Sequence, residues 1–235
     1  MQQLTKDVIQ WIKDYFKDNT DGKVICGISG GKDSTIVAAL CVEALGADRV
    51  IGVLMPNGVQ DDIEDSYKVC NYLGIDYYLK DISSAYFGLT GRIFSPNDIP
   101  DAVKTNLPAR LRMCTLYMIA AIYPNSRVVN TSNFSERYIG YSTKFGDGAG
   151  DFSPIGNLTV RDVLAIGDDL GLPRELVHKT PSDGMSGKSD EEKLGFTYEE
   201  LDEYLATGKG TDEVRAKIEK LHRANSHKLH DMPRF

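Results

Sequence analysis

Residues 27–34, Gly-Ile-Ser-Gly-Gly-Lys-Asp-Ser, restrict the possible folds of this chain more than any other segment. They follow residues 23–26, which form a short and mostly apolar run, and they precede residues 35–40, which have the composition of a buried helix. A turn rich in glycine and serine between a strand and a helix presents backbone N–H groups at the helix N-terminus, where the helix dipole favours an anion. The segment therefore predicts an α/β fold with a pyrophosphate site after an early strand.

The residue types within this turn suit a pyrophosphate group. Gly30 and Gly31 allow the backbone to approach a ligand closely, and Ser29 and Ser34 add hydroxyl donors. Asp33 is unsuited to direct contact with phosphate, but it can bind a divalent cation that also binds the phosphates.

Two commoner phosphate-binding turns are excluded by spacing. A Walker loop requires glycine five residues before Gly31, where this chain has Cys26, and serine or threonine after Lys32, where it has Asp33. The dinucleotide fingerprint requires glycine where this chain has Ser29.

Composition limits the class of protein. The 235 residues are 41% hydrophobic and 26% charged, which is typical of one globular α/β domain. The net charge of −7 argues against a general partner for nucleic acid or anionic membranes, and no apolar run approaches 18 residues. The opening residues are unlike a signal peptide, and the four cysteines form no CxxC pair. We therefore expect a cytoplasmic protein with reduced thiols.

Hydrophobic periodicity predicts alternating helices and strands. We expect helices near residues 4–20, 33–45, 60–73 and 104–122, and strands near residues 23–28, 49–54, 76–79 and 127–131. This alternation indicates a doubly wound, mostly parallel sheet flanked by helices, with ligands at the carboxyl ends of its strands. In the last third we expect helices at 159–170, 198–206 and 211–229, a loop at 146–151, and a lid over residues 181–189.

Further segments extend the pattern of the turn. Ser-Gly-Gly-x-Asp-Ser resembles the loop of N-type ATP pyrophosphatases, which cleave ATP to AMP and pyrophosphate. Residues 131–136, 140–148, 190–198 and 227–228 resemble, in the same order, the later motifs of the short ammonia-dependent NAD synthetases. The resemblance covers nearly the whole chain. It implies the adenine-nucleotide α-hydrolase-like fold, a single synthetase domain over residues 1–235 and no glutaminase domain.

The resemblance also implies a reaction and its residues. ATP would adenylate the nicotinate carboxylate of deamido-NAD, and ammonia would displace AMP to give NAD. Asp33 and Glu136 would be the catalytic Mg²⁺ ligands, and Asp147 would lie near a second Mg²⁺. The ATP-binding residues would be Gly27, Ile28, Ser29, Gly30, Gly31, Lys32, Asp33, Ser34, Thr131, Arg161 and Ser182. Those for deamido-NAD would be Arg110, Lys144, Asp151, His227 and Lys228.

Helix geometry separates Arg110 from Arg112. Residues two apart on a helix point about 200° apart, so both side chains cannot reach one ligand from a regular helix. Arg110 matches the family's dinucleotide contact, and we expect Arg112 to form a structural or interface ion pair.

The chain departs from the family pattern at three places. The ATP-contacting lysine of the family falls at Val160, and Arg161 is its neighbour. Ser182 replaces a threonine and keeps its hydroxyl group. Ser132 replaces an aspartate, so that one carboxylate is lost.

Three alternative functions remain open from the sequence. A different amidating ligase, such as the GMP-synthetase type, would use the same loop. A tRNA-thiolating enzyme would be expected to have catalytic cysteines and a basic face, which this chain lacks. A regulator that binds ATP without cleaving it would not need both Asp33 and Glu136.

The resemblance further implies a homodimer whose dinucleotide site uses both subunits. Trp11, Tyr15, Phe16, Tyr117 and Met118 are the candidate interface residues. Because no glutaminase domain fits in this length, ammonia would come from solution or from a separate partner protein.

Overall fold

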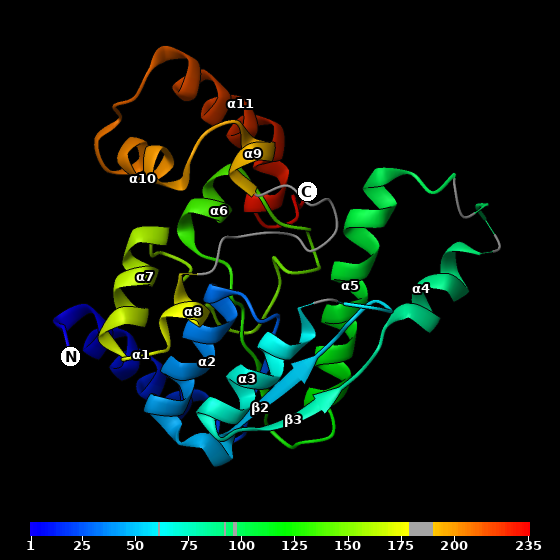
Figure 1. The fold of residues 1–235 in the computed structure, drawn as a ribbon, viewed down its shortest axis with the longest axis vertical. Helices are drawn as coiled ribbons and strands as arrows, with labels where there is room; N and C mark the ends of the chain where they lie inside the picture. The colour runs from blue at the N-terminus through cyan, green and yellow to red at the C-terminus, as the bar shows by residue number, and fades with distance from the viewer. Residues whose placement is uncertain (61, 92, 96–97, 179–189) are drawn as a thin grey trace.

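A parallel sheet forms the centre of the molecule (Figure 1). The computed structural model describes residues 1–235 except 61, 92, 96–97 and 179–189, and within these residues the sheet has four strands. Their order is β3-β2-β1-β4, with β1 at Val24–Gly27, β2 at Val50–Leu54, β3 at Asp76–Leu79 and β4 at Arg127–Val128. The register pairs Val24 with Val50 on one side and with Arg127 on the other. The doubly wound parallel sheet predicted from the sequence is confirmed.

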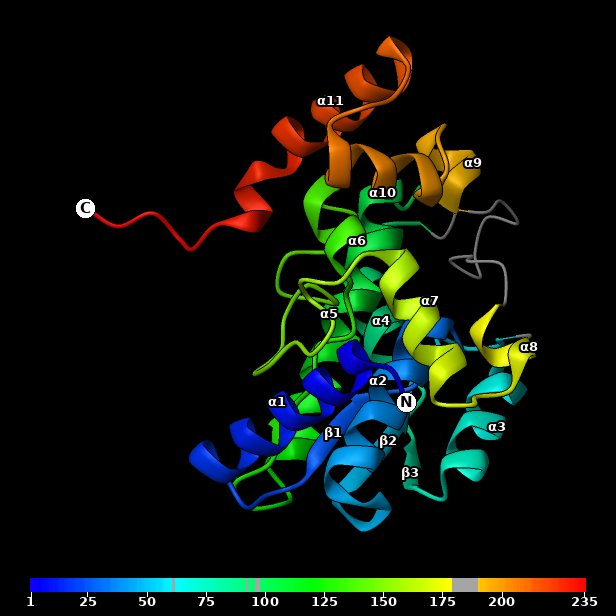
Figure 2. The same ribbon diagram turned by 90° about the vertical axis from the view of Figure 1, so that its left-hand side faces the viewer.

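Helices cover both faces of this sheet, and a group of helices from the last third lies beyond its edge (Figures 1 and 2). In chain order the helices are α1 (Gln3–Asn19), α2 (Lys32–Leu45), a 3₁₀ turn (Ala47–Arg49), α3 (Ile63–Leu73), α4 (Ser83–Thr90), α5 (Asp101–Ala120), α6 (Phe134–Ile139), α7 (Val160–Asp169), α8 (Arg174–Val177), α9 (Asp190–Leu194), α10 (Tyr198–Thr207) and α11 (Asp212–Leu229).

The two faces of the sheet have separate hydrophobic cores because strand side chains alternate. Val24 and Cys26 of β1 pack with α1, α2, α3 and α7, whereas Ile25 packs with Met113 and Leu116 of α5. A third core joins α6, α7, α10 and α11 through buried residues that include Ile139, Val160, Phe196, Leu201 and Ile218.

The sequence predicts the long elements well and the short ones poorly. It does not predict α4, α6, α8 or α9, because helices of four to eight residues complete too few turns to show a period. Helix α5 begins before the expected residue 104 and continues through Pro108, and β4 ends at Val128 rather than near residue 131. Beyond Val128, Val129 N still donates to the Ile25 carbonyl oxygen of β1, whereas Asn130 N donates to the Phe152 carbonyl oxygen.

The strand order places a topological switch point between β1 and β4. The chain leaves β1 toward α2 on one face and reaches β4 from α5 on the other (Figure 2). In doubly wound folds ligands bind in the crevice outside the carboxyl ends of the strands at this point. The turn after β1 and the residues after β4 therefore share one edge.

No helix within the described residues is long and apolar enough to cross a membrane.

Candidate functional site

The turn after β1 is held by its own hydroxyl groups. The Ser29 and Ser34 hydroxyl oxygens lie 3.0 Å apart, and the Gly31 N–H donates to Ser29 Oγ over 3.2 Å. Gly30 has a φ of +77°, and a Cβ there would lie 3.0 Å from atoms of Asp65 and Ser66 on α3. This close approach in the left-handed region requires glycine.

Helix α2 begins directly after this turn without a side-chain cap. Gly31 is the N-cap residue, and it has no side chain to accept the first N–H groups of the helix. Such N–H groups, together with the positive end of the helix dipole, form an anion site. The sequence-based expectation of a phosphate-binding turn thus has the required local geometry.

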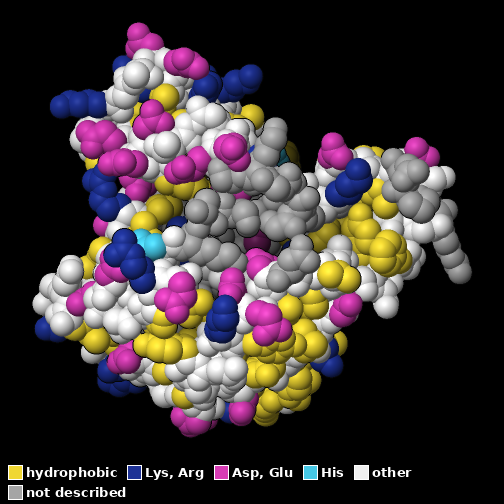
Figure 3. Space-filling view, viewed as in Figure 1, with side chains coloured by type: hydrophobic (Ala, Val, Ile, Leu, Met, Phe, Trp, Pro, Cys, Tyr) yellow, Lys and Arg dark blue, Asp and Glu magenta, His cyan; other side chains and the backbone are white. Residues whose placement is uncertain are grey.

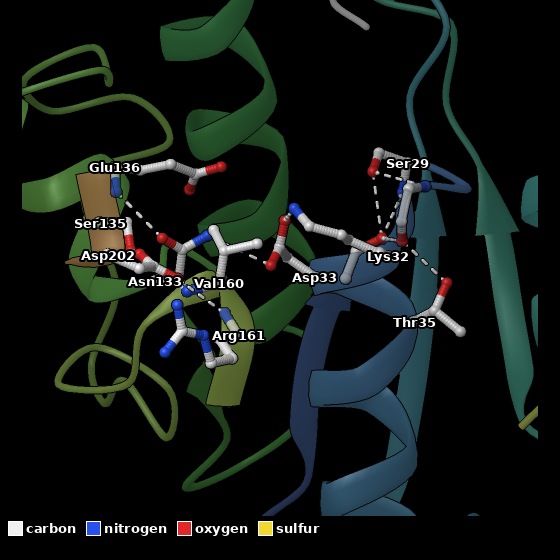
Figure 4. Close-up of polar contacts among 12 residues, drawn as sticks. Ser29, Lys32, Asp33, Thr35, Asn133, Ser135, Glu136, Val160, Arg161 and Asp202 are labelled. Carbon is white, nitrogen blue, oxygen red and sulfur yellow. Dashed lines mark hydrogen bonds and ion pairs between the residues drawn. The ribbon is translucent and has the colours of Figure 1, made fainter. Parts of the chain in front are cut away.

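Asp33 lies in the first turn of α2 and is held from two sides (Figure 4). Lys32 Nζ is 2.6 Å from its Oδ2 atom, and Asn133 Nδ2 donates to its Oδ1 atom over 3.3 Å. The Lys32 side chain is only 6% exposed, so it is not a solvated surface lysine.

Glu136 reaches the same place from α6. Asn133 caps this helix by accepting a hydrogen bond from the Glu136 N–H over 3.0 Å, so one asparagine orients both acidic residues. Burial and, next, the negative charge of Asp33 raise the pKa of Glu136 to about 8, against the opposing effect of the Lys32 ammonium. Both acidic residues line the same cavity.

A buried network anchors α6 behind Glu136. Ser135 Oγ donates to Asp202 Oδ1 over 2.5 Å and accepts from the Val160 N–H over 3.1 Å. Asp202 Oδ2 accepts from the Arg161 N–H over 2.9 Å, which adds an acceptor at the N-terminus of α7 (Figure 4). The network joins α6, α7 and α10.

A cavity of about 910 Å³ joins these groups. Its wall includes the turn after β1, Asp33, Glu136, Thr131 and residues of α5, α9 and α11. Asp190 of α9 also lines it and accepts a hydrogen bond from the Tyr141 hydroxyl over 2.9 Å. The arrangement combines anion-binding N–H groups, a buried ammonium group and several carboxylates in one space.

The acids fit a magnesium ion shared with phosphates. No group of three or more His, Cys, Asp or Glu side chains in the described part of the chain is placed to hold a metal alone. Mg²⁺ commonly uses only one or two carboxylates and completes its shell with phosphates and water. The repulsion that raises the pKa of Glu136 is the interaction that a cation between the two acids would relieve.

Four of the five residues expected to bind the dinucleotide lie together at the rim. Arg110 Nε donates to the Lys144 carbonyl oxygen over 3.2 Å, and Lys144 Nζ donates to the His227 carbonyl oxygen over 2.5 Å. Lys228 lines the cavity, and its Nζ atom donates to the carbonyl oxygens of Gly140 and Ser142, each over 2.9 Å.

Asp151 lies apart from this rim cluster. Its carboxylate accepts hydrogen bonds from the Val128 N–H over 2.7 Å and from the Tyr117 hydroxyl over 3.1 Å. Both carboxylate oxygens therefore already brace β4 against α5.

The two arginines of α5 differ in their surroundings, and the expected ion pair of Arg112 stays a prediction. Arg112 lines the cavity, and its Nε atom donates to the Met55 carbonyl oxygen over 3.0 Å. Burial lowers the pKa of its guanidinium group, and the nearby Asp147 opposes that shift. Arg110 is exposed. Helix geometry predicts the angle between the two side chains. The sequence does not show which face of α5 lies against the cavity.

The three remaining expected site residues, Arg161, Asp147 and Ser182, differ in where they lie. Arg161 is exposed and is not part of the cavity wall, because its backbone rather than its side chain faces the buried network. The structure therefore does not support it as a replacement for the family lysine at Val160. Asp147 lines the cavity on the side of Arg112 and Lys228. Ser182 and the whole expected lid at residues 181–189 lie outside the described residues.

Sequence reasoning missed Asn133 and Asp190 as site residues. Asn133 precedes Glu136 by three residues, and an asparagine N-cap at this spacing from an acidic residue is a recognisable start of a helix. Asp190 begins the motif at residues 190–198, but that resemblance does not show that its side chain reaches the cavity, because this depends on the tertiary packing of the last third.

Comparisons with known proteins agree with this geometry. The family model described as NAD synthase matches residues 4–234. The NH(3)-dependent NAD(+) synthetase of Methanocaldococcus jannaschii is 39% identical over 222 residues, covering 91% of this chain and 85% of that protein. The NMN synthetase structure from Francisella tularensis has a TM-score of 0.89 at 32% identity, covering 99% and 98% of the chains. The NH3-dependent NAD synthetase structure from Campylobacter jejuni, in complex with nitrate, has a TM-score of 0.80 at 30% identity, covering 100% and 97%.

Proposed function

Because this chain belongs to the NAD synthase family, we propose that it forms NAD from deamido-NAD, ATP and ammonia. The observation that carries the proposal is the single cavity in which the anion-binding turn, Asp33 and Glu136 meet. A ligase that releases pyrophosphate needs these groups together, because much negative charge leaves in one step.

The proposed reaction has two steps. A nicotinate carboxylate oxygen attacks the α-phosphorus of ATP, the bond to the β-phosphate oxygen breaks, and pyrophosphate leaves. Ammonia then attacks the carbonyl carbon of the acyl adenylate, and AMP leaves with the electrons of the acyl–oxygen bond. No covalent protein nucleophile is needed, so positioning and charge stabilisation supply the catalysis.

The residues of this chain divide the work in the first step. The N–H groups of the turn and of the first turn of α2 stabilise the departing pyrophosphate. Asp33 and Glu136 would hold Mg²⁺, which when bound supplies charge neutralisation at the phosphates. Thr131 would contact ATP and Lys228 would contact the acceptor; both residues line the cavity, as does Asp147.

One assay tests this function against the alternatives. The protein is mixed with ATP, Mg²⁺, ammonium and deamido-NAD, and the products are separated by chromatography. We expect NAD, AMP and pyrophosphate in equal amounts. Formation of ADP, or cleavage of ATP without NAD, would refute the proposal. Asp33→Asn should abolish NAD formation. Asp14→Asn is the matched control and should leave it unchanged, because Asp14 is exposed on α1.

A second acceptor is favoured by one comparison. The NMN synthetase structure shares almost the whole fold with this chain. Asp151, one of the expected dinucleotide contacts, has both carboxylate oxygens occupied, and Arg110 is exposed at the rim. We therefore propose nicotinic acid mononucleotide as the competing acceptor. A competition assay with both acceptors compares kcat/KM, and a ratio above one for the mononucleotide would replace the first assignment.

The proposal includes a homodimer in the cytoplasm that uses free ammonia or ammonia from a separate protein. Trp11 is 46% exposed and Met118 is 51% exposed, although Phe16 belongs to the core. Figure 3 shows further hydrophobic side chains gathered over α4, where Phe87 and Leu89 are exposed. The cysteines are free thiols, in keeping with a reducing compartment.

A further inference from the structure

Lys32 is a buried cation at a position where a cation is intrinsically unfavourable. It is the first residue of α2, and the helix dipole there disfavours positive charge. Its side chain is nevertheless only 6% exposed, with Nζ 2.6 Å from Asp33 Oδ2 and 5.7 Å from the centre of the Tyr198 ring. Burial of an ammonium group at this point needs compensating negative charge.

The compensation comes from the acids of the cavity. Asp33, Glu136 and Asp190 each interact favourably with the Lys32 ammonium. These acids come from three separate elements, α2, α6 and α9, so the lysine is the shared counter-ion of a site assembled by the fold.

This contact uses the carboxylate that a metal ion would need. Asp33 Oδ2 lies against Lys32, and Asp33 Oδ1 accepts from Asn133. A divalent cation that binds Asp33 must therefore compete with the ammonium for the same carboxylate. The lysine stem is flexible, and the N-terminus of α2 lies beside the cavity where an anion would enter.

We propose that Lys32 is a positioning residue that serves as an internal counter-ion of Asp33 until a divalent cation displaces it. The inference rests on the proposed metal site. In the nucleotide-free protein the ammonium weakens binding of divalent cations. When ATP is present, its phosphates offer the displaced ammonium a new partner. Metal and nucleotide then bind together more readily than the metal binds alone.

Binding of Mn²⁺ to the nucleotide-free protein tests this role without any turnover. Replacing Lys32 by methionine keeps the length of the side chain and removes its charge. We expect Lys32→Met to bind Mn²⁺ about tenfold more tightly or better, because a competing charge within about 3 Å is lost. Lys32→Arg keeps the charge and should bind Mn²⁺ with nearly the affinity of the unmodified protein.

Lys217→Met is the matched control. Lys217 forms an exposed ion pair with Glu213 on α11 and is not part of the cavity wall, so its loss changes net charge equally. Its Mn²⁺ affinity should not change. A folded Lys32→Met protein that binds Mn²⁺ no more tightly than the unmodified protein would overturn the proposal.

A measurement on the unmodified protein covers the case in which Lys32→Met does not fold. Reductive methylation followed by mass spectrometry reports the reactivity of each lysine amine. We expect Lys32 to react slowly without metal and several times faster in saturating Mg²⁺ without nucleotide. An unchanged rate at Lys32 in saturating Mg²⁺ would contradict displacement. Neither readout depends on NAD formation, so a failed synthetase assay with successful metal binding would refute only the proposed reaction.

Discussion

At the scale of single residues, the site is a balance of buried charges. Asp33 and Glu136 repel each other, and Lys32 offsets part of that repulsion. Asn133 donates to the Asp33 carboxylate through Nδ2 and accepts from the Glu136 backbone N–H through Oδ1. The balance is incomplete in the protein alone, because the pKa of Glu136 remains raised to about 8. A proton or a metal ion completes it.

The first prediction concerns the pH dependence of stability in EDTA. Glu136 has an ordinary pKa of 4.5, so between about pH 4.5 and pH 8 the folded protein holds a proton that the unfolded chain has lost. The free energy of unfolding should therefore fall as pH rises through this window. Glu136→Gln should reduce the slope, and saturating Mg²⁺ should offset the loss near pH 8. Thermal unfolding measures all three, and an equal slope in Glu136→Gln would contradict the charge balance.

Only some of the site residues could be predicted from the sequence. It located Asp33 from the recognisable turn, and the resemblance of residues 131–136 to the family pattern located Glu136. Both residues line the cavity. It could not show that Lys32 turns toward Asp33, or that Arg112 rather than Arg110 faces the cavity, because these depend on how α2 and α5 rotate against their neighbours.

At the scale of elements, the short helix α6 has an importance beyond its six residues. It carries Glu136, and its position depends on the bonds of Ser135 to α7 and α10. Asp202 is 3% exposed and accepts hydrogen bonds from two elements at once. Helix α10 therefore supports the site from behind.

The second prediction is that Asp202→Ala both destabilises the protein and lowers its activity. Removing the buried Asp202 carboxylate leaves the Ser135 hydroxyl and the Arg161 N–H without their acceptor. We expect this loss to lower the free energy of unfolding by about 2–4 kcal/mol. Glu136 should lose its fixed position, so kcat should fall more than KM rises. Glu203→Ala is the control, because Glu203 is exposed on the same helix. Unfolding in urea and steady-state kinetics make the comparison, and a stable Asp202→Ala protein with full activity would refute this role.

The long periodic elements could be predicted from the sequence. The contact between Ser135 of α6 and Asp202 of α10 could not. The alternation of helices and strands and the pattern of α1, α2 and α11 follow from local spacing. Helix α6 shows no such period, and its tie to Asp202 spans 67 residues of sequence. Contacts over that distance are set by tertiary packing.

At the scale of the whole molecule, apolar side chains remain uncovered on the α5 side. Tyr117 is 40% exposed, Met118 is 51% exposed and Ile122 is 57% exposed. The Tyr117 and Tyr15 hydroxyl groups both donate to Asp151, which brings the α1 and α5 surfaces next to each other. We propose that a second copy of the chain covers this surface.

The third prediction is that Met118→Glu gives a monomer. A charge placed in an apolar interface is costly to bury, whereas the same change on a free surface is nearly neutral. Light scattering coupled to size-exclusion chromatography measures the mass in solution. Met232→Glu is the control, because Met232 is 71% exposed near the C-terminus. We expect the unmodified protein to have the mass of a dimer. A Met118→Glu protein that is still dimeric would place the interface elsewhere, and a monomeric unmodified protein would refute the proposed dimer.

The most direct test of the whole account is a crystal structure with Mn²⁺ and an ATP analogue that cannot be cleaved. The account predicts the β- and γ-phosphates against the N–H groups of residues 29–34. It also predicts an anomalous peak for manganese bound by both Asp33 and Glu136. A triphosphate bound away from this turn, or a metal that contacts neither acid, would contradict it.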